Sequence, residues 1–413
     1  MILEYTCSNF KSIKDKIIFS MLATTDTSYE ENLVKITNNK VNRITAIYGS
    51  NGSGKSCFIN SINLLKNIIC NSNNFQPGDM IPYMPHKLSE KPASHTIQFI
   101  KGSTRYAYGI EYDSSKIYNE YLYYFPNGKQ AKIFDRTIDG ITFGEKFKKD
   151  LDKIKSFIKP NKSFLAIAAN LTNVNDIIQV FMFFKDDLII YPEEHNDWLF
   201  YSIDKINKDN EIKKIFIEFM QSIGYEIQDI HTKVEQANIS EEAFIQNMPE
   251  IVRKQFANLN PIKMEAKLDY GKFIVDLAEE SNGMKKLFEV ICPILDIIFN
   301  NKILLWDEME TKFHPYIVDA ILNLFMNSKK DSMSQLIFST HDTNLLDLNR
   351  FRRDQIWFTE LTTDRATDLY SLSELKNVRK DENIRKGYMN GKYGAIPFLQ
   401  NPLIFPITEE VDG

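Results

Sequence analysis

Residues 49–56 read Gly-Ser-Asn-Gly-Ser-Gly-Lys-Ser and fit the pattern GxxxxGK[ST] in full. Glycines let a backbone wrap around phosphates, while successive N–H groups and a helix N-terminus supply positive potential. In such a loop the lysine reaches the β- and γ-phosphates and the last hydroxyl binds Mg²⁺. The sequence therefore predicts ATP and Mg²⁺ as cofactors. The predicted nucleotide-binding residues here are Gly49, Ser50, Asn51, Gly52, Ser53, Gly54, Lys55, Ser56 and Cys57.

An acid pair, Asp307 and Glu308, follows the apolar run 303–306. A short apolar run of this kind is typical of a buried strand, although many such runs simply end in a solvated turn. Beside a phosphate loop, Asp307 is expected to hold Mg²⁺ through water, so that the predicted metal ligands are Ser56 and Asp307. Glu308 is then placed to orient or deprotonate an attacking water.

Two further stretches could complete such a site. His341 in "FSTHD" (338–342) follows another apolar run, where a sensor of the γ-phosphate would sit. Lys55, Glu308 and His341 are the predicted catalytic residues. In "EESNGMKKL" (279–287), Ser281 and Gly283 fall at a turn that opens an apolar helix, which is a second potential anion site. An ordinary capped helix would have the same local chemistry.

The elements that must position these residues can be read along the chain. Residues 43–49 form a short apolar run, and 55–70 have helical spacing, so strand, loop and helix follow one another. Strand-like alternation between 95 and 125 predicts an antiparallel subdomain. From about 145 to 260 the pattern is mainly helical. The predicted division is residues 1–140 (N-terminal lobe), 141–262 (helical insertion) and 263–413 (C-terminal lobe).

Composition sets wider bounds. The 413 residues carry 43% hydrophobic and 25% charged side chains and a formal charge of −5, which argues against a dedicated nucleic-acid coat. The four cysteines show no CxxC spacing, so neither a zinc site nor a disulfide framework is predicted. The apolar runs are too short to span a bilayer and no signal peptide is evident, so a cytoplasmic location without membrane partners is expected.

The order of phosphate loop, insertion, serine–glycine turn, acid-pair strand and histidine strand resembles the heads of ABC-class ATPases. The SMC, RecF and OLD branch is closest, and the opening "NFKSIKD" (9–15) supports it. The resemblance implies an α/β fold: a P-loop ABC-class head, with a mixed sheet, an antiparallel subdomain and a mainly helical insertion. It also implies that Ser281 and Gly283 bind ATP in trans, in a head-to-tail homodimer or a higher homo-oligomer.

A narrower resemblance rests on "LWDEMETKFHP" (305–315), "RRDQIWFTE" (352–360) and "IRKGYMNGKYGAIPF" (384–398). These stretches resemble bacterial ATPases of anti-phage abortive-infection systems: AbiL-type proteins, RloB-associated proteins and the AriA subunit of PARIS. The resemblance implies an ATP-hydrolysing sensor or scaffold that controls a separate toxic effector, nuclease-like and of the Toprim or RloB type, after a phage-encoded trigger. About fifty residues follow "IWFTE", too few for a nuclease domain, so destructive chemistry is assigned to the partner.

Other interpretations stay open. Residues 145–162 carry seven lysines against three acids and could track a nucleic-acid backbone, as in a RecF-like DNA-repair ATPase, or form a solvated helix face. An ABC transporter ATPase is disfavoured by the long insertion. The Mg²⁺-binding glutamine of ABC heads is not placed: Gln98 is a weak candidate, and Glu120 reads as a turn acid.

Overall fold

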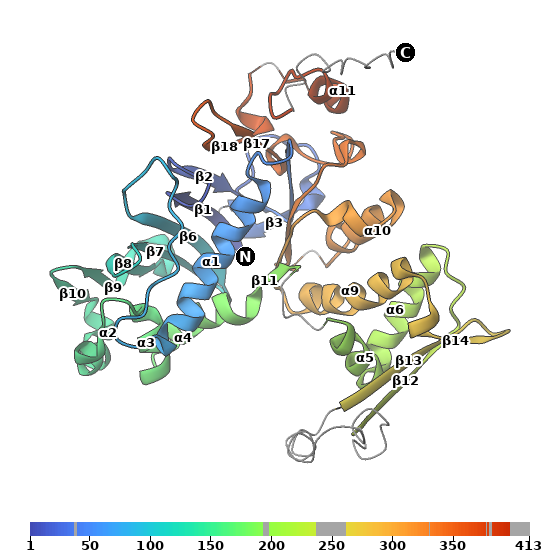
Figure 1. The fold of residues 1–413 in the computed structure, drawn as a ribbon, viewed down its shortest axis with the longest axis horizontal. Coiled ribbons are helices and arrows are strands. Elements are labelled where there is room, and N and C mark those ends of the chain that lie inside the picture. Colours follow the sequence, from blue (N-terminus) through green and yellow to red (C-terminus); the bar gives the residue numbers. More distant parts are fainter. Residues whose placement is uncertain are drawn as a thin grey trace, which may run out of the picture.

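The computed structural model describes residues 1–36, 39–192, 198–236, 262–329, 331–376, 378–379 and 382–396. A six-stranded sheet, called the central sheet below, and a seven-stranded antiparallel sheet organise most of these residues. Helix α1 (Lys55–Asn71) lies between the two sheets (Figure 1). The predicted combination of a mixed sheet with an antiparallel subdomain is therefore present.

The central sheet has the strand order β11–β15–β16–β5–β17–β18. Its strands are β5 (Ile44–Gly49), β11 (Leu188–Tyr191), β15 (Ile303–Trp306), β16 (Gln335–Ser339), β17 (Ile356–Leu361) and β18 (Thr367–Ser371). All pairs are parallel except that of β17 with β18. Because β5, β16 and β15 are parallel neighbours, their carboxyl ends meet at one edge, with the phosphate loop, the histidine and the acid pair.

Alternate residues of the central sheet face two different hydrophobic cores. Ile303 and Leu305 of β15 join the core shared with the antiparallel sheet. Leu304 and Trp306 join the core on the other face, which includes α9 (Asn282–Phe299) and α10 (Pro315–Met326). Burial on both faces explains why these strands read as continuous apolar runs in the sequence.

The antiparallel sheet has the order β10–β9–β8–β7–β6–β1–β2. Its strands are β1 (Ile2–Ser8), β2 (Ile17–Ser20), β6 (Ala93–Lys101), β7 (Thr104–Tyr112), β8 (Ile117–Tyr124), β9 (Ala131–Thr137) and β10 (Gly140–Phe143). It is wider than the sequence predicts, since the N-terminal strands join it. A separate ribbon pairs β3 (Leu33–Ile36) with β4 (Asn39–Asn42).

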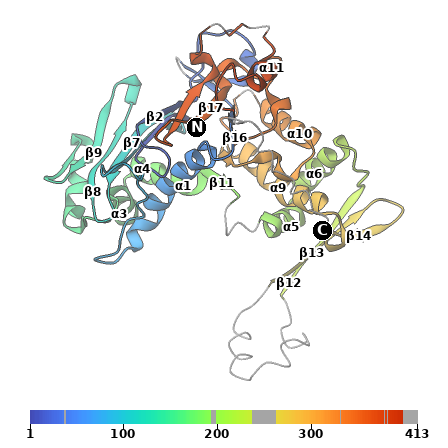
Figure 2. The ribbon, with the colours of Figure 1, turned by 45° about the horizontal axis from the view of Figure 1, so that its top comes forward.

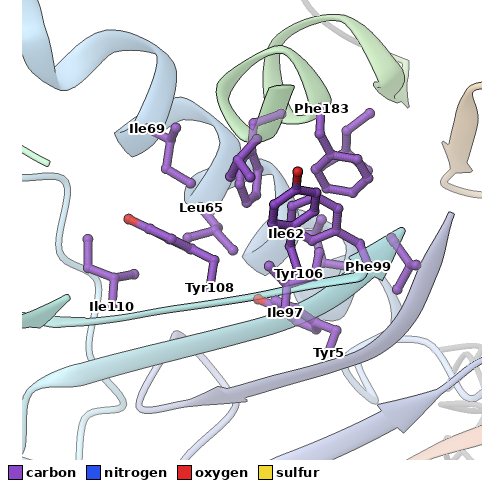
Figure 3. Close-up of a cluster of buried hydrophobic side chains, with 14 of the residues drawn as sticks. Tyr5, Ile62, Leu65, Ile69, Ile97, Phe99, Tyr106, Tyr108, Ile110 and Phe183 are labelled. Atoms are coloured by element: carbon purple, nitrogen blue, oxygen red, sulfur yellow. The ribbon is translucent and has the colours of Figure 1, made fainter. Parts of the chain in front are cut away.

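Helix α1 is fixed on the antiparallel sheet by one apolar face. Ile62, Leu65 and Ile69 recur at helical spacing and point into a cluster with residues of β6 and β7 (Figure 3). Phe99 of β6 stacks on Phe183, with ring centroids 3.7 Å apart. This packing holds the start of α1, and with it Lys55, in a fixed place relative to both sheets.

The helical content predicted for residues 141–262 is present. Its helices are α2 (Glu145–Leu151), α3 (Phe164–Leu171), α4 (Asn175–Met182), α5 (Trp198–Lys208) and α6 (Asn210–Ser222). Two features of this segment differ from the single helical insertion that the sequence predicts. Strand β11 belongs to the central sheet, because its run Leu-Ile-Ile-Tyr pairs with β15. In addition, buried side chains of α2–α4 join the core of the antiparallel sheet, whereas those of α5 and α6 join the other.

Helices α5 and α6 lie beside a three-stranded sheet, on the side of the molecule away from the antiparallel sheet (Figures 1 and 2). That small sheet contains β12 (Asp229–Gln236), β13 (Ile262–Asp269) and β14 (Ile274–Asp276). Residues 237–261 of the expected insertion lie outside the described residues. The division of the chain at residues 140 and 262 stays a prediction.

No single helix in the described ranges is long and apolar enough to cross a membrane. Helix α3 and the segment Asn175–Asp187 pass that test only as a pair bent by 120°, by length and composition. Their side chains Phe164, Leu165, Val180 and Phe184 belong to the core of the antiparallel sheet.

Candidate nucleotide-binding site

The phosphate loop connects the end of β5 to the start of α1, as predicted. Gly54 lies at the N-cap of α1 with φ of 114°, in the region that favours glycine. A Cβ at Gly54 would lie 2.1 Å from Thr367 Oγ1. Gly52 also has a positive φ, 77°, and is exposed together with Asn51 at the tip of the loop. Glycine at position 54 is therefore required both by conformation and by the close approach of β18.

Lys55 is the charged centre of the loop. Its side chain is buried, and Nζ donates to the carbonyl oxygens of Gly49 at 2.9 Å and Ser50 at 3.2 Å. Burial lowers the pKa of Lys55, while the negative charges of Asp307, Glu308 and Glu310 oppose that shift. A buried ammonium group held by loop carbonyls is positioned to exchange those partners for phosphate oxygens.

The back of the phosphate loop is held by hydroxyl groups from distant segments. Ser53 Oγ lies 2.6 Å from Thr359 Oγ1 of β17, and Thr367 Oγ1 donates to Ser53 O at 3.1 Å. Thr367 Oγ1 also lies 2.7 Å from Ser12 Oγ, within the "NFKSIKD" stretch. Cys57 Sγ contacts the carbonyl oxygen of Phe10, in the same stretch, at 3.6 Å. The side chains of Ser53 and Cys57 thus anchor the loop. The backbone N–H of Ser53 donates to Ser50 O at 3.1 Å, and that of Cys57 is a candidate phosphate contact.

Asp307 and Glu308 leave the carboxyl end of β15, two strands from the phosphate loop, which corresponds to roughly 10 Å at the usual strand spacing. A single hydroxyl organises the pair: Ser339 Oγ, at the end of β16, donates to Asp307 Oδ1 at 2.5 Å and accepts from Glu308 N at 2.8 Å. Glu308 itself has φ of 50°, a conformation that is uncommon for residues other than glycine. Ser339 was not predicted as a site residue, although it lies in the stretch "FSTHD".

His341 follows β16 as predicted, and its side chain is only partly covered by the surrounding protein. Partial burial and the positive charge of Lys55 lower the pKa of His341, while Glu310, Glu308 and Asp307 oppose the shift. The lowered pKa favours the neutral imidazole. Its backbone N–H donates to the Glu310 carboxylate. Glu310 was also missed in the sequence analysis, where it is the second glutamate of "DEME".

Ser281 and Gly283 lie at the start of α9, not in the phosphate loop. Ser281 is the N-cap residue, and its Oγ accepts from Met284 N at 3.2 Å. Both residues are exposed, and a Cβ at Gly283 would meet nothing within 4 Å. One turn further along α9, Lys286 lines a cavity of 140 Å³ together with Asp307 and Glu308. The turn is a regular helix cap that is open to solvent.

Gln98 and Glu120, the two residues considered for the Mg²⁺-binding glutamine of ABC heads, lie in the antiparallel sheet. Gln98 of β6 contacts Glu4 and Arg105 there. The interpretation of Glu120 as a turn acid is wrong: it lies in β8 and is fully buried. Its carboxylate accepts hydrogen bonds from Tyr108 Oη, Ser163 Oγ, Phe164 N, Leu165 N and Arg136. The alternating pattern of β8 hid this residue, because an acid in a strand usually faces solvent.

The residues present fit ATP and Mg²⁺. The buried Lys55 cation and the Gly54 cradle suit a phosphate group, while the Ser56 hydroxyl and the Asp307 carboxylate supply oxygen ligands of the type that Mg²⁺ prefers. In the described residues there is no cluster of three or more His, Cys, Asp or Glu that could hold a metal ion. A phosphate-loop Mg²⁺ needs no such cluster, because phosphate oxygens and water complete its coordination.

Two solved structures resemble the chain over most of its length. Among solved structures, the chain is similar to an SMC head bound to the C-terminal winged-helix domain of ScpA, with 15% identity and a TM-score of 0.42, over 90% of this chain and 97% of that one. It is also similar to the SMC head domain of Thermotoga maritima, with 13% identity and a TM-score of 0.41, over 90% of this chain and 98% of that one. No curated protein matches.

A family model described as "AAA domain, putative AbiEii toxin, Type IV TA system" matches residues 44–347. That range contains the phosphate loop, the acid pair and His341. The match and the sheet topology confirm the predicted fold class, a P-loop ABC-class ATPase head. Since the family model matches most of the sequence, the chain belongs to this AAA domain family of P-loop ATPases.

Proposed function

We propose that this protein is the ATP-hydrolysing sensor or scaffold subunit of an anti-phage abortive-infection system. It controls a separate toxic effector, nuclease-like and of the Toprim or RloB type, after a phage-encoded trigger. The description of its family names an AbiEii toxin and a type IV toxin–antitoxin system, which supports a role in abortive infection. The narrower resemblance to AbiL-type, RloB-associated and AriA proteins supports the division of labour between ATPase and effector.

In this proposal the chain's own residues divide the work on ATP. The backbone of residues 49–57 wraps the phosphates, and Lys55 neutralises charge on the β- and γ-phosphates. Ser56 and Asp307 hold Mg²⁺, which supplies charge neutralisation at the transferring phosphoryl group. Glu308 orients the attacking water, and the neutral imidazole of His341 contacts the γ-phosphate region.

The observation that supports a head-to-tail dimer is the solvent-exposed turn at Ser281–Gly283. It presents the N-terminus of an 18-residue helix to solvent, where helix N–H groups favour an anion. The phosphate loop of the same chain is assembled at the edge of the central sheet instead. Two copies that meet head to tail would bring each turn onto the nucleotide of the other. ATP binding would then favour the closed dimer, and hydrolysis would open it.

Replacing Ser281 tests this arrangement. In the Glu308→Gln background with ATP and Mg²⁺, light scattering should find a dimer, and the added Ser281→Arg change should leave a monomer that still binds ATP. Asp209→Arg is the matched control, because Asp209 caps α6 through Glu211 N and Ile212 N. If the Ser281→Arg protein dimerises as well as the control, the head-to-tail arrangement is wrong.

The effector is tested by co-expressing the tagged protein with its genomic neighbours and measuring the mass of the purified native complex. A stoichiometric neighbour that carries nuclease or other toxic motifs supports the proposal. A homodimer that carries DNA and no second protein would contradict it and favour the alternative below.

The second candidate function is a RecF-like DNA-binding or DNA-repair ATPase. The observation behind it is the surface of α2, where Lys148 and Lys149 are exposed while Phe147 and Leu151 are buried. Duplex DNA binding that weakens steeply with salt, and that is lost in Lys148→Glu/Lys149→Glu, would support it. Absence of binding at low salt would exclude it.

A further inference from the structure

We propose that Glu310 is a positioning residue of the ATPase reaction, which couples the turn carrying Glu308 to the turn carrying His341. The inference rests on the proposed ATP hydrolysis and deepens it. Glu310 lies in the 3₁₀ turn Met309–Lys312, directly after the acid pair. No role follows from its sequence position alone, because acids after a strand are commonly solvated.

The first observation is the hydrogen bond between the two turns. One oxygen of the Glu310 carboxylate accepts from His341 N, across 31 residues of sequence. The backbone position of His341 is therefore tied to the side chain of Glu310. A shift of the acid-bearing turn would be carried directly to the histidine.

The second observation is the state of the other carboxylate oxygen. Glu310 Oε2 is buried and has no hydrogen-bond partner in the described chain. Buried polar atoms are nearly always paired, so an unpaired carboxylate oxygen requires an explanation. Within the same protein, Glu120 shows what a structural buried glutamate looks like, since both its oxygens accept several hydrogen bonds. Glu310 does not follow that pattern.

The third observation is where the negative charge acts. The charge of Glu310 raises the pKa of Lys55 and of His341, so it lies within electrostatic reach of the phosphate loop and of the histidine. It also acts on Tyr48, the fully buried residue before Gly49; the Tyr48 hydroxyl likewise has no hydrogen-bond partner among the described residues. The carboxylate thus acts electrostatically on groups from three neighbouring elements at the carboxyl-end edge of the central sheet.

The turn that holds Glu310 also sets the conformation of Glu308. Thr311 donates to Glu308 O through its backbone N at 3.1 Å and through Oγ1 at 2.9 Å. These contacts stabilise the turn in which Glu308 has a positive φ. Through this turn and its own bond to His341 N, Glu310 connects Glu308 and His341 in one hydrogen-bonded unit.

Two substitutions separate the contact from the charge. Glu310→Gln keeps the shape and an oxygen that can accept from His341 N, whereas Glu310→Ala removes the acceptor. Glu374→Gln is the matched control, because Glu374 also accepts from a backbone N–H, that of Ser371 at 3.0 Å, outside the site.

Steady-state ATP hydrolysis and nucleotide binding are measured for all variants. We expect kcat to fall about 30-fold or more in Glu310→Ala and about 3- to 10-fold in Glu310→Gln, with KM and ATP affinity within about threefold of the parent. The control should match the parent. Parental kcat in both Glu310 variants would overturn the inference. An inactive parent would instead count against the proposed function.

A second readout does not depend on turnover. The His341 side chain, followed by NMR and assigned with His341→Asn, should titrate at lower pH in Glu310→Gln than in the parent, because a charge that favours the imidazolium has been removed. An unchanged titration would place Glu310 away from His341 and overturn the inference.

Discussion

Two regions of the molecule bury charged side chains and treat them differently. In the antiparallel sheet, Glu120 accepts five hydrogen bonds and pairs with Arg136, whose guanidinium also donates to the carbonyl oxygens of Lys159 and Lys162. At the edge of the central sheet, Lys55 donates to two loop carbonyls. Glu310 Oε2 and Tyr48 Oη have no hydrogen-bond partner among the described residues.

The number of hydrogen-bond partners thus distinguishes buried charges that stabilise the fold from buried charges that are available to bind a ligand. A buried charge with a full set of partners costs little and specifies one packing, while removal of a partner leaves an uncompensated group. A buried charge with weak partners costs stability, and evolution retains it where binding or catalysis needs it.

Lys55→Ala should abolish nucleotide binding, with an affinity loss of at least about 1,000-fold, or about 4 kcal/mol. The buried ammonium is the principal positive charge in the phosphate loop. Isothermal titration calorimetry with ATP and Mg²⁺ measures the loss. Lys66→Ala is the matched control, since Lys66 lies on the same helix and donates to the carbonyl oxygen of Leu188. Equal affinities in the two variants would contradict the assignment of the site.

Glu120→Ala should lower the free energy of unfolding by about 3–4 kcal/mol, because it leaves Arg136 and several buried donors without their acceptor. Urea denaturation followed by circular dichroism measures the change. Glu111→Ala, on the neighbouring strand and partly exposed, should change it by less than about 0.5 kcal/mol. The folded fraction of Glu120→Ala should keep parental ATP affinity. A loss of affinity would show that the two regions are not independent.

Glu308→Gln should slow ATP hydrolysis about 100-fold, equivalent to about 2.7 kcal/mol, without weakening ATP binding. The amide keeps the side chain's size but cannot accept a proton from water. Single-turnover hydrolysis and nucleotide binding give the two quantities, with Glu279→Gln, an exposed acid, as control. Unchanged hydrolysis would remove Glu308 from the reaction.

The site was predictable wherever its chemistry is local. The glycine, lysine and serine pattern follows from a loop of eight residues, and the acid pair and His341 from apolar runs that end in polar residues. Ser339, Thr359 and Thr367 were missed because their partners depend on strand order. Thr359, for example, meets Ser53 across 306 residues because β17 lies next to β5.

The same reason explains the interpretations that changed. Glu120 occupies a position where an alternating strand commonly presents a solvent-facing residue, and its partners Ser163, Phe164 and Leu165 come from a helix start more than 40 residues later. Strand β11 was hidden inside a mainly helical segment. Its four residues give little pattern by themselves, and only pairing with β15 identifies them as part of the central sheet.

The smallest effect concerns His95, the buried histidine of the antiparallel sheet. Its Nδ1 lies 2.8 Å from Tyr5 Oη, and burial lowers its pKa to about 3. In the unfolded chain the same group binds a proton near pH 6.5. Between these pH values the unfolded state binds more protons, so stability falls as the pH decreases, by about 1.4 kcal/mol per pH unit for this one group.

His95→Gln should remove that dependence while an amide replaces the ring nitrogens as hydrogen-bonding groups for Tyr5 and Tyr112. Urea denaturation between pH 6 and 4 should then show the stability advantage of the parent over the variant shrinking by about 1.4 kcal/mol per pH unit. His231→Gln, which replaces an exposed histidine of β12, serves as control. If the advantage stays constant over this range, His95 is protonated in the folded protein. In that case the antiparallel sheet tolerates an uncompensated buried charge, and the division between the two regions fails.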